Sequence, residues 1–231
     1  MILLELARYG INNENNMKKK SWLLALLLTL TTSAQSAPAN EKLSLVRNNI
    51  KVWTYRSEAN PVIQYKAETT YDVPLERAVS LVLDVARAPE WVPYMGDTKI
   101  LSRDDKKGEF VLYMVLDFPF PLKDRDVVVK SSLSKDATGR IVIRNMALSG
   151  GYPEQPGRIR IHHYVGDWTF QKLGAQKVKV TTSGYADPAG SIPLSFVNMF
   201  VEQQPYQMLM KMKTELAQST VSNVYLPDVL K

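Results

Sequence analysis

One long helical pattern near the C-terminus limits the folds that are open to this chain. Between positions 193 and 216, apolar residues recur every three or four positions, which is typical of one buried helix face. These residues are Val197, Phe200, Val201, Met208, Leu209, Met212 and Leu216. Ser191 is a suitable cap for the helix and Pro193 suits its first turn, whereas Pro205 should kink it because proline removes a backbone hydrogen bond. The preceding hundred residues alternate like strands, so this one helix is expected to cover a sheet.

Methionine is unusually frequent on the inner face of this helix. The residues concerned are Met199, Met208, Met210 and Met212. Methionine is flexible and polarizable, so it suits a surface that adapts to more than one apolar shape. Two interpretations follow from the helix alone: ordinary core packing on a sheet, or a lid over a cavity.

Short segments of alternating hydrophobicity make up most of the remaining chain. The predicted strands are Lys42–Arg47, Ile50–Arg56, Val62–Tyr71, Thr98–Arg103, Glu109–Phe118, Asp126–Leu133, Arg140–Leu148, Arg158–Tyr164, Asp167–Lys172 and Lys177–Tyr185. Between the third and fourth strands we expect a helix capped by Asp72, a break at Ala88-Pro89, and a short helical turn near Glu90–Met95. Short connections, including a turn at Gly166, predict an antiparallel meander, and Ser219–Lys231 is expected to be a polar tail.

The strand Glu109–Phe118 is apolar on both faces, so one face should pack on a core and the other should meet a helix or a ligand. The predicted fold class is therefore α+β, with a curved antiparallel sheet wrapped around the C-terminal helix. The space between them is the natural place for an apolar ligand. The candidate cavity and lid residues are Leu112, Met114, Trp168, Val197, Phe200, Val201, Met208 and Met212.

The N-terminal region predicts a secretory signal peptide that begins at Met17. Three lysines precede the apolar run Trp22–Leu30, and the small residues of Ala34-Gln35-Ser36 follow it, with cleavage expected after Ser36. The run is too short to span a bilayer, although a membrane anchor is the alternative. The expected layout is an N-terminal extension plus signal peptide over 1–36, a single domain over 37–221 and a C-terminal tail over 222–231. A chain organised in this way would be periplasmic.

Composition narrows the possible partners. The 231 residues include no cysteine, which excludes thiol chemistry and cysteine metal sites. The formal net charge of +6 is scattered, which argues against nucleic-acid binding and permits transient contact with an anionic membrane surface. We expect a monomer without a cofactor.

A catalytic constellation is not recognisable in the sequence. No G-x-S-x-G or H-E-x-x-H motif occurs, and His162 and His163 are adjacent on a predicted strand, so they point to opposite faces. The densest polar cluster is Asp124, Arg125 and Asp126. We interpret it as a structural polar knot, in which the guanidinium bridges carboxylates and carbonyls where the sheet bends.

Five motifs in this order resemble the START family, the lipid-transfer domains of the helix-grip, birch-pollen-allergen-like type. They are Asn49–Val52, Trp91, Pro121-Leu122 with Asp124–Asp126, Gly166–Trp168, and Asp187–Pro193. The resemblance covers about Glu41 to Ser219 and suggests a bacterial, exported member. It implies a hydrophobic tunnel gated by the C-terminal helix and adjacent loops, with cargoes such as sterols, phospholipids or ceramides.

Two departures from the family pattern bear on cargo. Only Ala37–Glu41 is available for the extra N-terminal helix of larger members. Sterol and phospholipid binders often carry a tunnel arginine six residues after the arginine that corresponds to Arg125, and here that position is Ser131. The favoured function is therefore a non-enzymatic carrier of a lipid or other hydrophobic molecule. The alternatives are a cyclase or aromatase that acts in the same cavity, and an interaction module whose cavity is filled by its own side chains.

Overall fold

The computed structural model describes residues 41–57, 60–190, 192–193, 196–197, 199–218 and 226–230. Residues 38–231 group into one compact unit. The expected leader and the expected cap Ser191 lie outside the described residues. No helix within the described ranges is long and apolar enough to cross a membrane.

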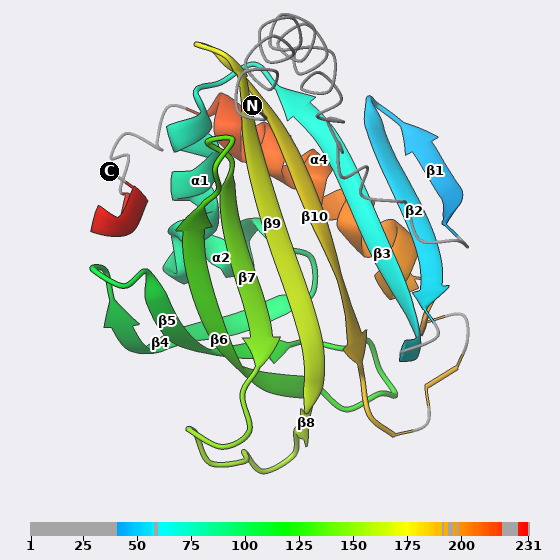
Figure 1. The fold of residues 1–231 in the computed structure, drawn as a ribbon. Coiled ribbons are helices and arrows are strands. Elements are labelled where there is room, and N and C mark those ends of the chain that lie inside the picture. Colours follow the sequence, from blue (N-terminus) through cyan, green and yellow to red (C-terminus); the bar gives the residue numbers. More distant parts are fainter. Residues whose placement is uncertain are drawn as a thin grey trace, which may run out of the picture. The chain divides into compact units, whose positions relative to one another are not determined.

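One large, curved sheet contains the ten strands of the described residues (Figure 1). The strands are β1 (Lys42–Arg47), β2 (Ile50–Ser57), β3 (Asn60–Tyr71), β4 (Met95–Asp104), β5 (Glu109–Leu116), β6 (Arg125–Lys135), β7 (Ile141–Ala147), β8 (Ile159–Arg160), β9 (His163–Gly174) and β10 (Lys177–Asp187). Their order is β1-β2-β3-β10-β9-β7-β6-β5-β4, and β8 pairs with β6. The α+β class with a curved antiparallel sheet is confirmed.

The predicted antiparallel meander is wrong at two points. β3 pairs with the last strand, β10, because the helical segment after β3 carries the chain across to the other end of the sheet. The two-residue β8 runs parallel to β6, so the ladder is not antiparallel throughout. The expected turn at Gly166 is also wrong, because Gly166 pairs with Gly184 in the middle of the continuous strand β9.

Two short helices follow β3. α1 (Leu75–Leu83) begins after Pro74, which occupies the cap position without a side-chain hydrogen bond, so the expected cap by Asp72 is wrong. The turn η1 (Val85–Arg87) leads into α2 (Ala88–Trp91). Pro89 lies in the first turn of α2, where its missing N–H does no harm, rather than breaking the helix.

The C-terminal helix is not a uniform α-helix. Phe196 and Val197 are helical, η2 (Met199–Gln203) winds as a π-helix, and α4 (Gln204–Ala217) is a regular α-helix. Pro205 lies in the first turn of α4, where the winding changes from π to α. Proline cannot donate the backbone hydrogen bond that an uninterrupted α-helix would need at this point. Short π segments are frequent at functional sites, so the helix segment around η2 is a candidate part of a functional site.

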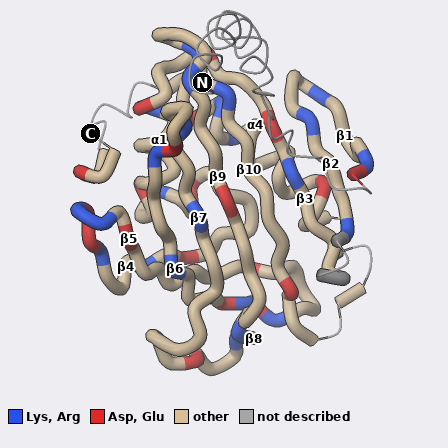
Figure 2. Tube along the Cα trace, in the orientation of Figure 1, with Lys and Arg blue, Asp and Glu red and all other residues tan. Residues whose placement is uncertain are grey.

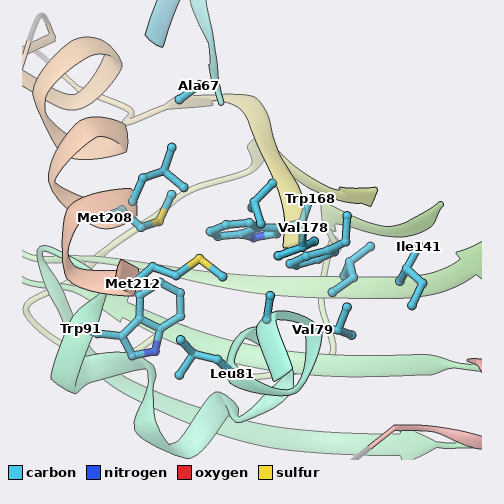
Figure 3. Packing of buried hydrophobic residues seen from close by; sticks show 14 of the residues in the cluster. Ala67, Val79, Leu81, Trp91, Ile141, Trp168, Val178, Met208 and Met212 are labelled. Atoms are coloured by element: carbon cyan, nitrogen blue, oxygen red, sulfur yellow. The ribbon is translucent and has the colours of Figure 1, made fainter. Parts of the chain in front are cut away.

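α4, α1 and α2 lie against the concave face of the sheet (Figure 1). Figure 3 shows Met208 and Met212 extending from α4 towards Trp91 of α2 and Trp168 of β9. These side chains belong to one continuous core that also includes Val52, Val180 and other residues of the central strands. Charged residues of both signs are scattered along the strands and gather over no single element (Figure 2).

The last described segment packs on the domain instead of forming a purely polar tail. η3 (Asp228–Leu230) lies near β6, Leu230 is buried, and Leu226 packs against the same core. Residues 219–225, which precede it, are outside the described ranges.

Candidate functional site

An apolar cavity of about 400 Å³ lies between the concave face of the sheet and the C-terminal helix. Pockets for small ligands commonly enclose about 300–1,000 Å³, so this volume is in the range of a binding site. The sheet contributes Leu112, Met114, Ile143 and Trp168, and the helical pair contributes Trp91. Inward positions of alternating strands supply these side chains, because every second residue of a strand points to the same face.

Seven of the eight cavity and lid residues expected from the sequence line this cavity. They are Leu112, Met114, Trp168, Val197, Phe200, Val201 and Met208. The eighth, Met212, is fully buried in the core one helical turn beyond Met208 and does not line the cavity. Helical spacing identifies the buried face of the helix but not where along that face the packing is open.

Hydrogen-bonding groups cross this apolar wall in a band that we call the polar row: Ser131, Asn145, Tyr164, Tyr65 and Thr182. The strand register places them together. Ser131 on β6 lies opposite Asn145 on β7, and Asn145 donates from Nδ2 to the carbonyl oxygen of Gly166 on β9. The Ser131 hydroxyl and Asn145 Oδ1 are 2.5 Å apart. Gly166 in turn pairs with Gly184 on β10, which pairs with Tyr65 on β3.

Two tyrosines give the polar row its deepest hydroxyl groups. The Tyr164 hydroxyl covers Gly166 so closely that a Cβ atom at that position would lie 2.1 Å from the oxygen. The Tyr65 hydroxyl is 3.5 Å from Thr182 Oγ1. Burial raises the pKa of Tyr65, and burial likewise raises the pKa of Tyr164, so both phenols stay neutral at physiological pH. These groups were not predicted from the sequence, although polar residues at inward positions of apolar strands are a recognisable signal.

Charged side chains are sparse around the cavity. Arg56 and Arg103 line it, and both are exposed residues, with Arg103 Nε donating to Asp105 at 2.8 Å. Among the described residues that line the cavity there is no aspartate, glutamate, lysine or histidine. His162 and His163 are exposed and do not line it. In the described ranges, no group of three or more histidine or acidic residues is placed to hold a metal ion.

Three aromatic rings of the cavity lining contact one another, and we call them the aromatic clasp: Phe118, Phe200 and Tyr94. The rings of Phe118 and Phe200 stack with centroids 4.5 Å apart, and the Tyr94 ring meets Phe200 edge-on at 5.4 Å. The Tyr94 hydroxyl lies 3.2 Å from Met199 Sδ. The clasp therefore joins the π-helical segment η2 to the β5–β6 loop and to the residue before β4. Phe120, two positions along the β5–β6 loop, is 95% exposed.

Arg125 connects the same loop to the segment that enters the C-terminal helix. Its guanidinium donates to the carbonyl oxygens of Pro188 at 3.1 Å and Ala189 at 3.3 Å, and also to that of Lys123. It also lies 4.4 Å from the centroid of the Phe118 ring. Burial lowers the pKa of Arg125, and the nearby carboxylate of Asp124 opposes this shift. Arg125 thus bridges carbonyls, as the sequence indicated, but within the described residues none of its hydrogen bonds reaches a carboxylate.

Asp126 faces the opposite side of β6 and does not join Arg125 in one cluster. Its carboxylate accepts hydrogen bonds from Arg160 at 2.7 and 3.1 Å and from the Tyr113 hydroxyl at 2.9 Å. Burial would raise the pKa of Asp126, but the hydrogen bonds from Arg160 and Tyr113 outweigh this effect and hold it below its usual value. Asp124 accepts from the backbone N–H of Phe118 at 3.1 Å. The expected single knot is therefore two separate arrangements on opposite faces of the sheet.

Comparison with known proteins yields matches over most of the chain. The sequence pattern of the START domain matches residues 28–221. An uncharacterized protein of Pseudomonas aeruginosa is 29% identical over 169 residues, which cover 73% of this chain and 82% of that protein. The phosphatidylcholine transfer protein of Bos taurus is 29% identical over 120 residues, half of this chain and 55% of that protein.

A solved structure shares the fold described above. The STAR-related lipid transfer protein of Xanthomonas axonopodis, determined as a fragment, is 27% identical and superimposes with a TM-score of 0.70. The superposition covers 78% of this chain and 99% of that fragment. The cavity and the helix that covers it therefore occur on a scaffold shared with a protein named for lipid transfer.

Proposed function

The chain belongs to the START domain family, and from that premise we propose that it binds a lipid or other hydrophobic small molecule in its cavity and transfers it without catalysis. The observation that carries this proposal is the apolar cavity of about 400 Å³ beneath the C-terminal helix. Burying an apolar ligand there removes its surface from water, which is favourable at about 25 cal/mol per Å².

The composition of the cavity wall favours a carrier over an enzyme. General acid–base catalysis needs a group that gains or loses a proton near neutral pH, most often histidine or a carboxylate. The described lining residues supply neither, and the pKa of each of the two buried tyrosines, Tyr65 and Tyr164, is raised further from neutrality. A cyclase or aromatase would have to work without such a group. The open volume likewise disfavours an interaction module with a cavity filled by its own side chains.

We further propose that the aromatic clasp holds the cavity closed and that η2 moves when cargo is exchanged. Aromatic pairs contribute about 0.5–1.5 kcal/mol each beyond area burial. Ring contacts of this strength can open reversibly when cargo is exchanged. The π-helical winding of η2 places the change of helix type beside the clasp. Cargo would then pass between the β5–β6 loop and the helix.

Lipid transfer between vesicles tests the function and the gate together. A fluorescent lipid should move from donor to acceptor vesicles faster with the protein than without it. Phe200→Ala removes both ring contacts of the clasp, so we expect transfer to accelerate roughly five- to tenfold as the open state gains population. Val197→Ala, which shortens another cavity-lining residue of the same helix, is the matched control. An unchanged rate in Phe200→Ala would refute the gate, whereas a wild-type protein that neither binds nor moves any apolar probe would refute the carrier.

Location and membrane contact are also proposals. We propose that the protein is exported and begins near Ala37, on the basis of the basic, apolar and small-residue pattern over positions 17–36. N-terminal sequencing of the protein from fractionated cells tests this, and a full-length, membrane-embedded product would contradict it.

The exposed Phe120 beside the clasp supports transient contact with a membrane surface. Co-sedimentation of Phe120→Ser with vesicles should then be weaker than that of the wild type.

A further inference from the structure

The polar row offers hydrogen bonds from the concave wall to the inside of the cavity across several strands. Its members come from β6, β7, β9, β10 and β3, and they meet because the register aligns Ser131 with Asn145 and Tyr65 with Gly184. Gly166 and Gly184, which pair with each other in the middle of the row, carry no side chain. The Tyr164 hydroxyl occupies this space above Gly166.

The two tyrosine hydroxyls of the polar row lack good hydrogen-bond partners among the described residues of the protein. The Tyr164 hydroxyl makes no hydrogen bond to another residue in the part of the chain that the structure describes. Among the residues that the structure describes, the Tyr65 hydroxyl has only the long, 3.5 Å contact with Thr182. Buried polar groups normally have a good hydrogen-bond partner, because leaving one unpaired is unfavourable. A donor left open on the wall of a cavity points to a partner supplied by the ligand.

The row is also uncharged. Its members Ser131 and Asn145 are neutral, and the Ser131 hydroxyl is already paired with Asn145. The two arginines of the cavity lining, Arg56 and Arg103, are exposed. A buried phosphate or carboxylate needs a charged partner or several strong donors, because an unpaired buried charge is very unfavourable. A hydroxyl or carbonyl oxygen needs only one neutral donor.

We propose that the cargo is a long apolar molecule with one uncharged oxygen, a hydroxyl or a carbonyl, which accepts a hydrogen bond from Tyr164 against the polar row. This inference rests on the carrier function proposed above and specifies its ligand class. It excludes a phosphorylated headgroup from the interior of the cavity. Tyr164 donates, and the Asn145 amide and the Tyr65–Thr182 pair position the oxygen.

A set of ligands with one alkyl chain and different head groups tests the proposal. The set comprises a primary alcohol, a methyl ketone, the alkane and the alkyl phosphate, each delivered from cyclodextrin to displace a bound apolar fluorophore. We expect the alcohol and the ketone to bind roughly tenfold tighter than the alkane and the alkyl phosphate. Tightest binding by the alkyl phosphate would overturn the inference and leave the carrier function intact.

Variants that lose a single hydroxyl assign the effect to the row. Tyr164→Phe should lower affinity for the alcohol and the ketone roughly tenfold and leave the alkane unchanged. Tyr206→Phe is the matched control, because its hydroxyl is bonded to Asn48 at 2.8 Å and does not line the cavity. Thr182→Val is a second, nearly isosteric test in case Tyr164→Phe folds poorly, and it should weaken the same two ligands. If both variants bind all four ligands like the wild type, the inference is wrong. If the wild type binds none of the four and no fluorophore, the carrier function itself fails.

Discussion

Replacing Arg125 by alanine should lower the free energy of unfolding by about 3–5 kcal/mol, because three backbone carbonyls lose their donor and a cavity opens under Phe118. The Arg125 side chain is almost fully buried, and its hydrogen bonds join the β5–β6 loop to the entry of the C-terminal helix. For a domain of this size the change corresponds to a fall in melting temperature of roughly 6–20 °C. Calorimetry or circular dichroism measures it directly.

Two control variants sharpen this prediction. Lys123→Ala changes an exposed residue of the same loop and should shift stability by less than about 0.5 kcal/mol. Arg125→Lys keeps the charge but not the planar group that reaches several carbonyls, so its stability should fall between those of the wild type and the alanine variant. Ligand affinity in Arg125→Ala should change less than stability does. An unchanged melting temperature together with abolished ligand binding would make Arg125 a ligand-binding residue instead.

Replacing Arg160 by methionine should be comparably damaging, because it leaves the carboxylate of Asp126 buried without its charged partner. Breaking such a pair from one side typically costs about 3–5 kcal/mol. Both side chains are at most 6% exposed, and the Nε–Oδ1 distance is 2.7 Å. Arg158→Met is the matched control, because Arg158 is exposed and donates a hydrogen bond to the Tyr113 hydroxyl at 3.0 Å. Chemical denaturation of the three proteins at neutral pH measures the difference.

The same pair predicts a dependence of stability on acid. The pKa of Asp126 is lower in the folded protein than its ordinary value, so the unfolded chain takes up the proton first as pH falls. The stability contributed by this carboxylate is therefore complete above the ordinary pKa of aspartate and is lost as pH falls through the lowered folded value. Asp126→Asn should lose less stability than the wild type over this acidic range. Parallel acid-denaturation curves for the two proteins would contradict the assignment.

Much of the architecture could be predicted from local patterns. Alternation located nearly every strand to within a few residues, because one face of this sheet is buried and period-two hydrophobicity records that burial. Helical spacing located the covering helix, and its apolar face is the one that packs on the sheet. The errors occur where local signals compete with pairing. Gly166 resembles a turn residue, but its place in the ladder opposite Gly184 keeps β9 continuous.

The candidate site could be predicted only in part from the same sequence patterns. Apolar residues such as Leu112 and Trp168 could be assigned to the cavity because inward-facing positions follow from alternation. Met212 could not be separated from Met208, since both lie on the buried face and only the packing around them leaves one beside open space. The π winding of η2 could not be predicted from the sequence either, because residue spacing does not distinguish a single π turn from an α-helix.

By itself, the sequence determined the elements, the buried face of each and the family resemblance, because these depend on residues close together in the chain. Only the tertiary structure decided which distant residues meet. The row from Ser131 to Tyr65 exists because separate strand pairings bring five strands into one register, and Asp126 finds Arg160 across 34 positions of chain. Alternation assigns a side chain to a face, but it contains no information on the partner opposite. That partner is set by pairing and packing over the whole sheet, which is why the ligand chemistry of the cavity became visible only in the folded protein.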